Sequence, residues 1–223
     1  MLLTAMCCAF LGFMLFRNES GVVKEYMNPA PKVAGAYADR QVGERFEFGR
    51  YPQGVNGEVK PITWRVLRRD DKSLLVIAEQ GLDCKRYNEQ YVSTTWASCT
   101  LRRWLNEEFI KRAFSEQEQS SIKTSEIPNN AGPPTKDLIF LLSVNEASSL
   151  FTDDSNRICK PTDYAVKNGV YTFSYGNSWW WLRSHGSCSY RAALVSNCGF
   201  ISINGYYVID NVGSVRPALR LTI

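Results

Sequence analysis

Histidine, the side chain that most often transfers protons in enzymes, occurs once among the 223 residues of the chain. That histidine, His185, lies three residues before Cys188, a spacing that could bring an imidazole to a thiol nucleophile. Both residues fall in an expected loop, and no third group is placed to orient the imidazole. We therefore expect no catalytic dyad here.

Paired carboxylates, which could share acid and base roles, occur at Asp70 with Asp71 and at Asp153 with Asp154. Both pairs are interpreted as solvated loop residues. The sequence also has no HExxH motif, no GxSxG nucleophile elbow and no P-loop. No recognisable catalytic site follows from the local motifs.

The cysteines lack the spacing of metal ligands. No CxxC pair occurs, and a single histidine provides no partner for a zinc or iron centre, so no cofactor is expected. Two interpretations stay open: the thiols pack as small hydrophobic groups, or disulfides join Cys84 to Cys99, or Cys188 to Cys198 across a hairpin, in an oxidising compartment. The seven cysteines are Cys7, Cys8, Cys84, Cys99, Cys159, Cys188 and Cys198.

The richest segment for binding follows Trp179, where three tryptophans precede Leu182 and Arg183. Flat aromatic rings and a guanidinium can stack on sugar faces or anchor a protein interface. Neighbouring strand residues point to opposite faces, so at least one tryptophan belongs to the core, and burial of all three, with Arg183 as a structural charge, is the alternative. The candidate ligand-binding residues are Trp180, Arg183, His185, Ser189, Tyr190, Arg191, Phe200, Ser202, Tyr206, Tyr207 and Asp210.

The formal net charge of +4 is spread over both halves of the chain, without a basic run interleaved with aromatic residues. The electrostatic footprint of a nucleic-acid-binding protein is therefore missing. We expect no nucleic-acid partner, and the exposed aromatic candidates favour an unknown glycan or protein as ligand.

The elements that must position these residues form an α+β pattern. Strands are expected at residues 42–48, 62–67 and 74–78, and a helix capped by Thr100 buries Leu101, Leu105, Phe109 and Ile110. Capping boxes at Ser115 with Glu118 and at Ser143 with Glu146 begin two more helices, and residues 164–168 form a helical turn closed by Gly169. Strands return at 179–183, 192–196, 200–204, 206–209 and 215–223, with turns at 197–199 and at Asn204 with Gly205.

Residues 1–16 form an apolar segment that is interpreted as a signal or membrane anchor, with residues 2–16 as the tether. No Lys or Arg precedes it and it is short for a bilayer span, so a buried arm or a misassigned start is the alternative. Residues 17–41 are a linker and residues 42–223 a single domain. A membrane-anchored or extracytoplasmic location is favoured over a cytoplasmic one.

Eight ordered strings between residue 42 and the C-terminus carry a family resemblance: PITWRVL at 61–67, GLDCKRYNEQY at 81–91, TTWASCTLRRWLNEEF at 94–109, AFSEQEQ at 113–119, FLLSVNEA at 140–147, CKPTDYA at 159–165, WWLRS at 180–184 and VRPAL at 215–219. They resemble the bacterial domain of unknown function 6273. Two departures occur, since His185 stands where that family usually has proline and Ser214 where glycine is expected.

The resemblance implies a C-type-lectin-like fold of the sulfatase-modifying-factor type, with antiparallel strands, a few short helices and a hairpin-rich C-terminal surface. Formylglycine-generating enzymes of this fold use cysteines, so a thiol enzyme acting through Cys188 or Cys198 is one alternative function. Related iron enzymes need three histidines, which one histidine excludes. The sugar-binding calcium motifs of C-type lectins are absent from the sequence, so calcium is not expected.

Residues 185–212 resemble the variable region of lectin-fold proteins that retroelements diversify, because polar and aromatic residues alternate with steadier ones. Ordinary hairpin alternation explains the same pattern. The leading hypothesis is a non-catalytic ligand-binding module that displays aromatic and arginine side chains on C-terminal hairpins. A structural domain of a surface assembly is the remaining alternative.

Overall fold

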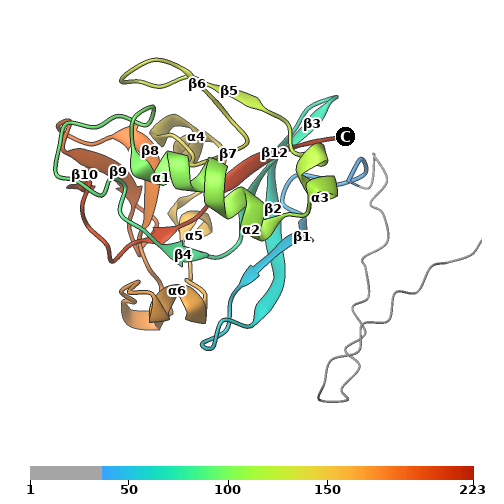
Figure 1. Ribbon diagram of the computed structural model, residues 1–223, viewed down its shortest axis with the longest axis horizontal. Coiled ribbons are helices and arrows are strands. Elements are labelled where there is room, and N and C mark those ends of the chain that lie inside the picture. Colours follow the sequence, from blue (N-terminus) through green and yellow to red (C-terminus); the bar gives the residue numbers. More distant parts are fainter. Residues whose placement is uncertain (1–36) are drawn as a thin grey trace, which may run out of the picture. The chain divides into compact units, whose positions relative to one another are not determined.

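The structure, a computed structural model, describes residues 37–223 and contains two five-stranded sheets (Figure 1). The first has the order β1-β2-β3-β12-β7 and is antiparallel throughout. Its strands are β1 (Arg45–Pro52), β2 (Val59–Arg69), β3 (Ser73–Ala78), β7 (Ile139–Phe140) and β12 (Ala218–Thr222). The strands expected at 42–48, 62–67 and 74–78 are confirmed, although the first begins at Arg45.

The second sheet carries the C-terminal hairpins and has the order β10-β9-β8-β11-β4. Its strands are β4 (Asp83–Cys84), β8 (Trp180–His185), β9 (Arg191–Val195), β10 (Ile201–Tyr207) and β11 (Ser214–Val215), and β11 runs parallel to β8. A separate hairpin pairs β5 (Ser125–Ile127) with β6 (Thr135–Asp137). The chain crosses from the second sheet to the first between β11 and β12, where one strand was expected over 215–223.

The expected hairpin turn at Asn204 and Gly205 is wrong, because β10 runs through both residues as one strand. Its register against β9 shifts between Ser202 and Tyr206, which marks a bulge. Gly205 has a φ of 65°, and a Cβ there would lie 2.0 Å from the Ala192 carbonyl oxygen. Gly205 therefore allows a bulge in which the β10 backbone lies close to that of β9, and it does not form a turn.

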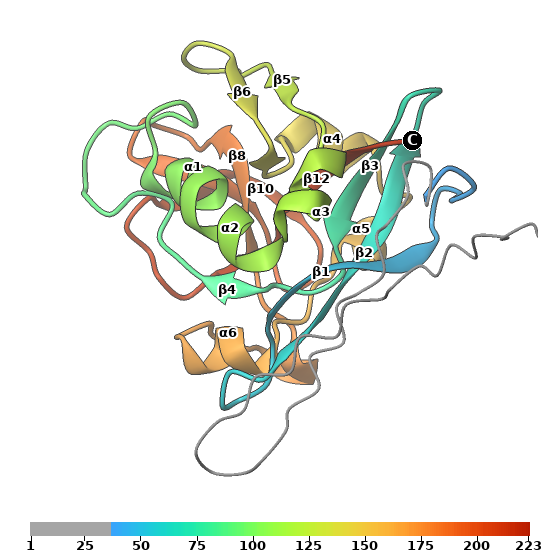
Figure 2. The same ribbon diagram turned by 45° about the vertical axis from the view of Figure 1, so that its right-hand side comes forward.

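The main helix consists of α1 (Thr100–Trp104), a π-helical turn η1 (Leu105–Phe109) and α2 (Ile110–Ala113), and it lies across the first sheet (Figures 1 and 2). The four residues of its expected apolar face are buried. The N-cap is Cys99, whose sulfur accepts from Arg102, one residue before the expected Thr100. Thr100 instead accepts a hydrogen bond from the Glu89 amide at 3.0 Å.

The shorter helices follow their capping signals. Both expected capping boxes are confirmed, at the starts of α3 (Glu116–Ser121) and α4 (Val144–Ser149). The other helices are α5 (Asp154–Arg157), α6 (Asp163–Lys167), which contains most of the helical turn expected at 164–168, and the 3-10 turn η2 (Ser174–Gly176). Sheets rich in antiparallel pairs with a few short helices confirm the α+β class.

The folded unit begins before the expected boundary at residue 42. Tyr37 is buried, and its ring lies 4.8 Å from Phe46 and 5.7 Å from Phe48 between centroids. The apolar segment at 1–16 and most of the expected linker lie outside the described residues. Within residues 37–223, no helix is long and apolar enough to cross a membrane.

Candidate ligand-binding surface

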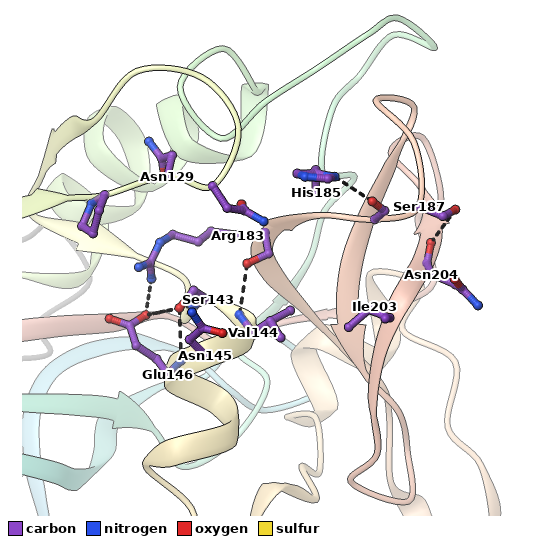
Figure 3. Close-up of a pocket in the computed structure, with 14 residues that line it drawn as sticks. Asn129, Ser143, Val144, Asn145, Glu146, Arg183, His185, Ser187, Ile203 and Asn204 are labelled. Atoms are coloured by element: carbon purple, nitrogen blue, oxygen red, sulfur yellow. Dashed lines mark hydrogen bonds and ion pairs between the residues drawn. The ribbon is translucent and has the colours of Figure 1, made fainter.

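A cleft of about 680 Å³ opens beside the end of β8 (Figure 3). Three parts of the chain form its walls: the β5–β6 loop, the start of α4, and the adjoining parts of β8 and β10. Two of the predicted ligand-binding residues, Arg183 and His185, line it. The lining residues are Pro128, Asn129, Asn130, Ser143, Val144, Asn145, Glu146, Arg183, Ser184, His185, Gly186, Ser187, Ile203 and Asn204.

Irregular strands shape this cleft. The register between β8 and β9 shifts between Trp181 and His185, opposite the bulge of β10. The β10 bulge places Ile203 and Asn204 on the cleft wall, where the Asn204 carbonyl accepts from the Ser187 amide at 3.2 Å. In a regular strand the side chains alternate between the two faces of the sheet, and a bulge changes the direction of those next to it.

Arg183 is buried in the cleft wall and forms an ion pair with Glu146. It also donates to the Leu141 carbonyl at 2.8 Å. Burial alone raises the pKa of Glu146, but the charge of Arg183 and hydrogen bonds from Arg183 and Ser143 outweigh burial and hold that pKa below its usual value. Glu146 is therefore ionised at neutral pH, and its negative charge offsets the positive charge of Arg183.

Two residues that line this cleft each have one buried polar atom without a hydrogen-bond partner, namely Nε of Arg183 and Oδ1 of Asn129. The Asn129 amide orientation is set by its Nδ2 group, which donates to the Pro133 carbonyl at 2.7 Å. His185 adds a third polar atom, since its Nδ1 lies 2.7 Å from the Gly186 carbonyl and must donate to it. Its Nε2 is then an acceptor in the neutral ring.

A second feature, the tyrosine cluster, consists of Tyr91, Tyr190, Tyr207 and Arg191. The Tyr91 ring lies 5.0 Å from Tyr190 and 5.6 Å from Tyr207 between centroids. The Arg191 guanidinium lies 4.3 Å from the centre of the Tyr207 ring, a cation–π contact. All three tyrosines are more than one-third exposed, at 53%, 38% and 42% respectively.

The cluster is held by backbone contacts between the β4–α1 loop and the C-terminal hairpins. The Thr94 amide donates to the Ser189 carbonyl at 2.9 Å, and the Asn88 amide donates to the Val208 carbonyl at 2.8 Å. The Asp210 amide donates to the Tyr207 carbonyl at 2.9 Å, and burial raises the pKa of the Asp210 carboxyl although the charge of Arg191 opposes this. Four predicted residues, Tyr190, Arg191, Tyr207 and Asp210, thus lie together, with Ser189 on the same turn.

The expectation that Trp180 lies on the binding surface is wrong. All three tryptophans are buried, because both faces of β8 are covered. On one side the Trp180 indole donates to the Arg157 carbonyl at 3.0 Å, and its ring lies 5.1 Å from the guanidinium of Arg216. On the other side the Trp181 indole donates to the Lys85 carbonyl at 3.0 Å.

The remaining predicted residues lie apart from the tyrosine cluster. Phe200 is exposed in the β9–β10 turn. Ser202 supports the β10 bulge by accepting from the Gly205 amide at 3.3 Å. Tyr206 is partly exposed and packs edge-on against Trp179, with 5.1 Å between ring centroids. The structure therefore divides the single predicted site into a cleft, a tyrosine cluster and separate residues.

The described cysteines are free, which agrees with the interpretation of separate packed thiols and not with the alternative disulfides Cys84–Cys99 and Cys188–Cys198. Cys188 and Cys198 lie in the turns at the two ends of β9, so they are separated by the length of a five-residue strand, about 17 Å. Cys99 caps the main helix, and burial raises its pKa to about 12. Over residues 37–223 no group of three potential metal ligands comes together.

Three residues of the cleft and the tyrosine cluster were not predicted, because they come from distant segments of the chain. Tyr91 lies in a loop without periodicity, and Glu146 was assigned only as a capping residue. Asn129 was assigned to a loop, and no local pattern connects it with Arg183. The Asn–Asn–Ala–Gly–Pro–Pro run at 129–134 was the one visible signal, since it predicts a turn that projects polar side chains.

A family model described as Domain of unknown function (DUF6273) matches residues 71–223. The chain belongs to this family. The DUF6273 match begins in the β2–β3 turn and covers both the cleft and the tyrosine cluster. Comparisons with curated proteins and with solved structures give no significant match.

Proposed function

We propose that this chain is a non-catalytic ligand-binding module whose C-terminal hairpins contact a glycan or a protein through the tyrosine cluster. The observation that carries the proposal is the convergence of Tyr91, Tyr190 and Tyr207 at one exposed site, with Arg191 stacked on Tyr207. Exposed aromatic rings that contact each other commonly mark interaction sites.

The cluster is suited to binding because its rings are already positioned. Tyr91 lies on a loop that is hydrogen-bonded to the hairpins, and Tyr207 lies on a strand. A tyrosine loses few rotamers on binding, so a fixed ring contacts a ligand at low entropic cost. The rings can stack on sugar faces or pack against apolar protein groups.

The same surface supports the finer proposal of a C-type-lectin-like fold with a diversified segment. Ala192, Ala193, Val195 and Val208 are fully buried and belong to the scaffold. Exposed residues lie on β10 and on the turns that flank β9. A neighbouring reverse transcriptase gene with a near-copy of the coding stretch for residues 185–212 would support diversification, and its absence would favour ordinary hairpin alternation.

The proposal is tested by screening the full chain against an array of glycans and surface proteins. Replacing both Tyr91 and Tyr190 by alanine should weaken binding at least tenfold, because centrally placed aromatic residues typically contribute about 2 kcal/mol or more to binding. Tyr175→Ala is the control, because Tyr175 is 91% exposed and lies on η2, outside the cluster.

Equal binding by the wild type and the double variant, with both folded, would contradict a role for the cluster. No binding to either class of ligand would instead favour a structural domain of a surface assembly. Unchanged binding by Tyr175→Ala would show that removing an exposed tyrosine outside the cluster does not weaken binding.

A further inference from the structure

We infer that the loop at residues 170–178 binds the surface of a membrane that contains anionic lipids. The loop is separate from the tyrosine cluster, so this inference goes beyond the proposed function. Three aromatic side chains on it, Tyr171, Phe173 and Tyr175, are 58%, 37% and 91% exposed, respectively. The Tyr171 and Phe173 rings contact each other edge-on, with 4.9 Å between their centroids.

Backbone hydrogen bonds hold this loop in place. The Tyr171 amide donates to the Val212 carbonyl at 2.9 Å, which joins the loop to the segment before β11. The Phe173 amide donates to the Asn177 carbonyl at 2.8 Å, and the Gly176 amide donates to the Phe173 carbonyl at 3.0 Å. The aromatic side chains are therefore displayed by a backbone that the rest of the domain positions.

Tyr175 has an unusual backbone conformation. Its φ is 67°, and within residues 37–223 no other residue except glycine has a positive φ. A bulky side chain is strained in this conformation, which glycine adopts freely. Because the Tyr175 side chain is 91% exposed, packing against the described residues does not explain why a tyrosine stands here. Strained residues of this kind cluster at functional sites.

The charges around the loop suit an anionic surface. The loop follows α6, and α6 lies beside the β1–β2 turn at one end of the domain (Figures 1 and 2), where the Tyr164 amide donates to the Gln53 carbonyl at 3.0 Å. Residues 50–60 and 159–178 contain four basic and two acidic residues, which gives a net charge of +2. All six are exposed: Arg50, Lys60, Lys160, Lys167, Glu58 and Asp163. Basic residues beside exposed aromatic rings are typical of segments that bind anionic lipids.

The small area of the three rings favours a membrane over a protein partner. An aromatic side chain presents about 150–250 Å², so the exposed fractions of the three rings amount to roughly 400 Å². A standard protein interface buries about 800 Å² on each partner. At a membrane, the burial of apolar area and the attraction of lysines to anionic lipids act together. Tyrosine also prefers the headgroup region, where its ring is buried and its hydroxyl group stays hydrated.

The test places a tryptophan in the loop of the full chain and follows its fluorescence with vesicles of brominated phosphatidylcholine and phosphatidylglycerol. Bromine quenches tryptophan only at short range, so the quenching reports which part of the domain lies at the bilayer. In Tyr175→Trp, most of the emission that the substitution adds should be quenched. Asn130→Trp is the matched control, because Asn130 is exposed in the β5–β6 loop at the opposite end of the domain, and its added emission should remain.

Lysine replacement tests the contribution of charge. In the Tyr175→Trp chain, Lys160→Gln and Lys167→Gln should each raise the lipid concentration for half-maximal quenching about fivefold, which corresponds to about 1 kcal/mol per lysine. Lys123→Gln with Lys136→Gln, at two exposed lysines beside and within the β5–β6 hairpin, should leave that concentration nearly unchanged. The comparison between lysine pairs also separates the loop from residues 1–16, which all variants retain.

The inference and the proposed function can fail separately. Tyr91→Ala with Tyr190→Ala, introduced into the Tyr175→Trp chain, should leave the quenching unchanged, because both tyrosines belong to the tyrosine cluster.

Three results would overturn the inference. The first is equal quenching of Tyr175→Trp and Asn130→Trp. The second is the absence of quenching in Tyr175→Trp at every lipid concentration, which would leave this end of the domain to a protein partner. The third is the same lipid dependence with and without Lys160 and Lys167.

Discussion

Two buried arginines differ in how completely the protein satisfies their hydrogen-bond donors. Arg216 is 0% exposed and donates to the carbonyls of Ala78, Arg157 and Glu79 at 2.8, 3.1 and 3.3 Å. Arg183 is nearly as buried, but one of its donors has no partner and it lines a cleft. Arg216 links backbone segments of the core through its hydrogen bonds. The protein satisfies only some of the donors of Arg183.

The surroundings of the two arginines explain this difference. Arg216 lies 5.1 Å from the Trp180 ring and 5.8 Å from the Phe151 ring, so its guanidinium is enclosed. Arg183 is bound on one side by Glu146 and Leu141, while its unpaired side has no protein acceptor. Two arginines that are buried to a similar degree therefore differ in how many of their donors the protein satisfies.

Replacing Arg216 by methionine should give the largest loss of stability. Three buried carbonyl groups would lose a charged donor, and hydrogen bonds to charged groups contribute about 1.5–3 kcal/mol each, so we expect a loss of at least about 3 kcal/mol. Urea unfolding followed by tryptophan fluorescence measures it. Arg220→Met, at a half-buried position in β12, serves as the control, and an equal effect of the two variants would contradict a special role for Arg216.

Replacing Arg183 by methionine should destabilise the protein less than the change at Arg216. The variant loses the hydrogen bond to Leu141 and leaves Glu146 unpaired, but Glu146 is 23% exposed and can be solvated. We expect a loss of about 2 kcal/mol in the same urea experiment. A loss larger than that of Arg216→Met would remove the distinction between the two arginines.

The acid dependence of the Arg183 pair should give the smallest effect. The folded-state pKa of Glu146 lies below its ordinary value of 4.5, so its ionised form stabilises the fold above that pH. This contribution is lost as the pH falls below about 4.5 and through the lowered pKa of the folded protein. Between pH 6 and pH 3, the free energy of unfolding should therefore fall more for the wild type than for Glu146→Gln. Most of the titration of a carboxylate takes place within about two pH units, and this interval contains them.

Urea unfolding at several pH values checks this sign. The glutamine side chain can still accept from the Ser143 amide, so the capping interaction is retained and the comparison isolates the charge. Parallel pH profiles for the wild type and the variant would contradict a stabilising ionised pair.

Much of the fold could be predicted because its signals are local. The capping boxes at Ser115 and Ser143 and the apolar face of the main helix each depend on residues within one or two turns. The Asn204–Gly205 turn was wrong because a glycine with positive φ suits both a turn and a bulge. Only the pairing with β9 decides between the two.

The site was predicted in part for the same reason. Arg183, His185 and Tyr190 were found because they belong to one conspicuous segment. Trp180 was misplaced because the groups that cover it, the Arg216 guanidinium and the Arg157 carbonyl, come from other parts of the chain. Asn129, Glu146 and Tyr91 were missed since only tertiary packing brings them to the hairpins.

The most direct test of binding by the C-terminal hairpins is a crystal structure of the full chain with the strongest ligand from the array. The account predicts that the ligand contacts Tyr91 and Tyr190 of the tyrosine cluster. A ligand bound only on the β1–β2 side of the first sheet, away from this cluster, would contradict it.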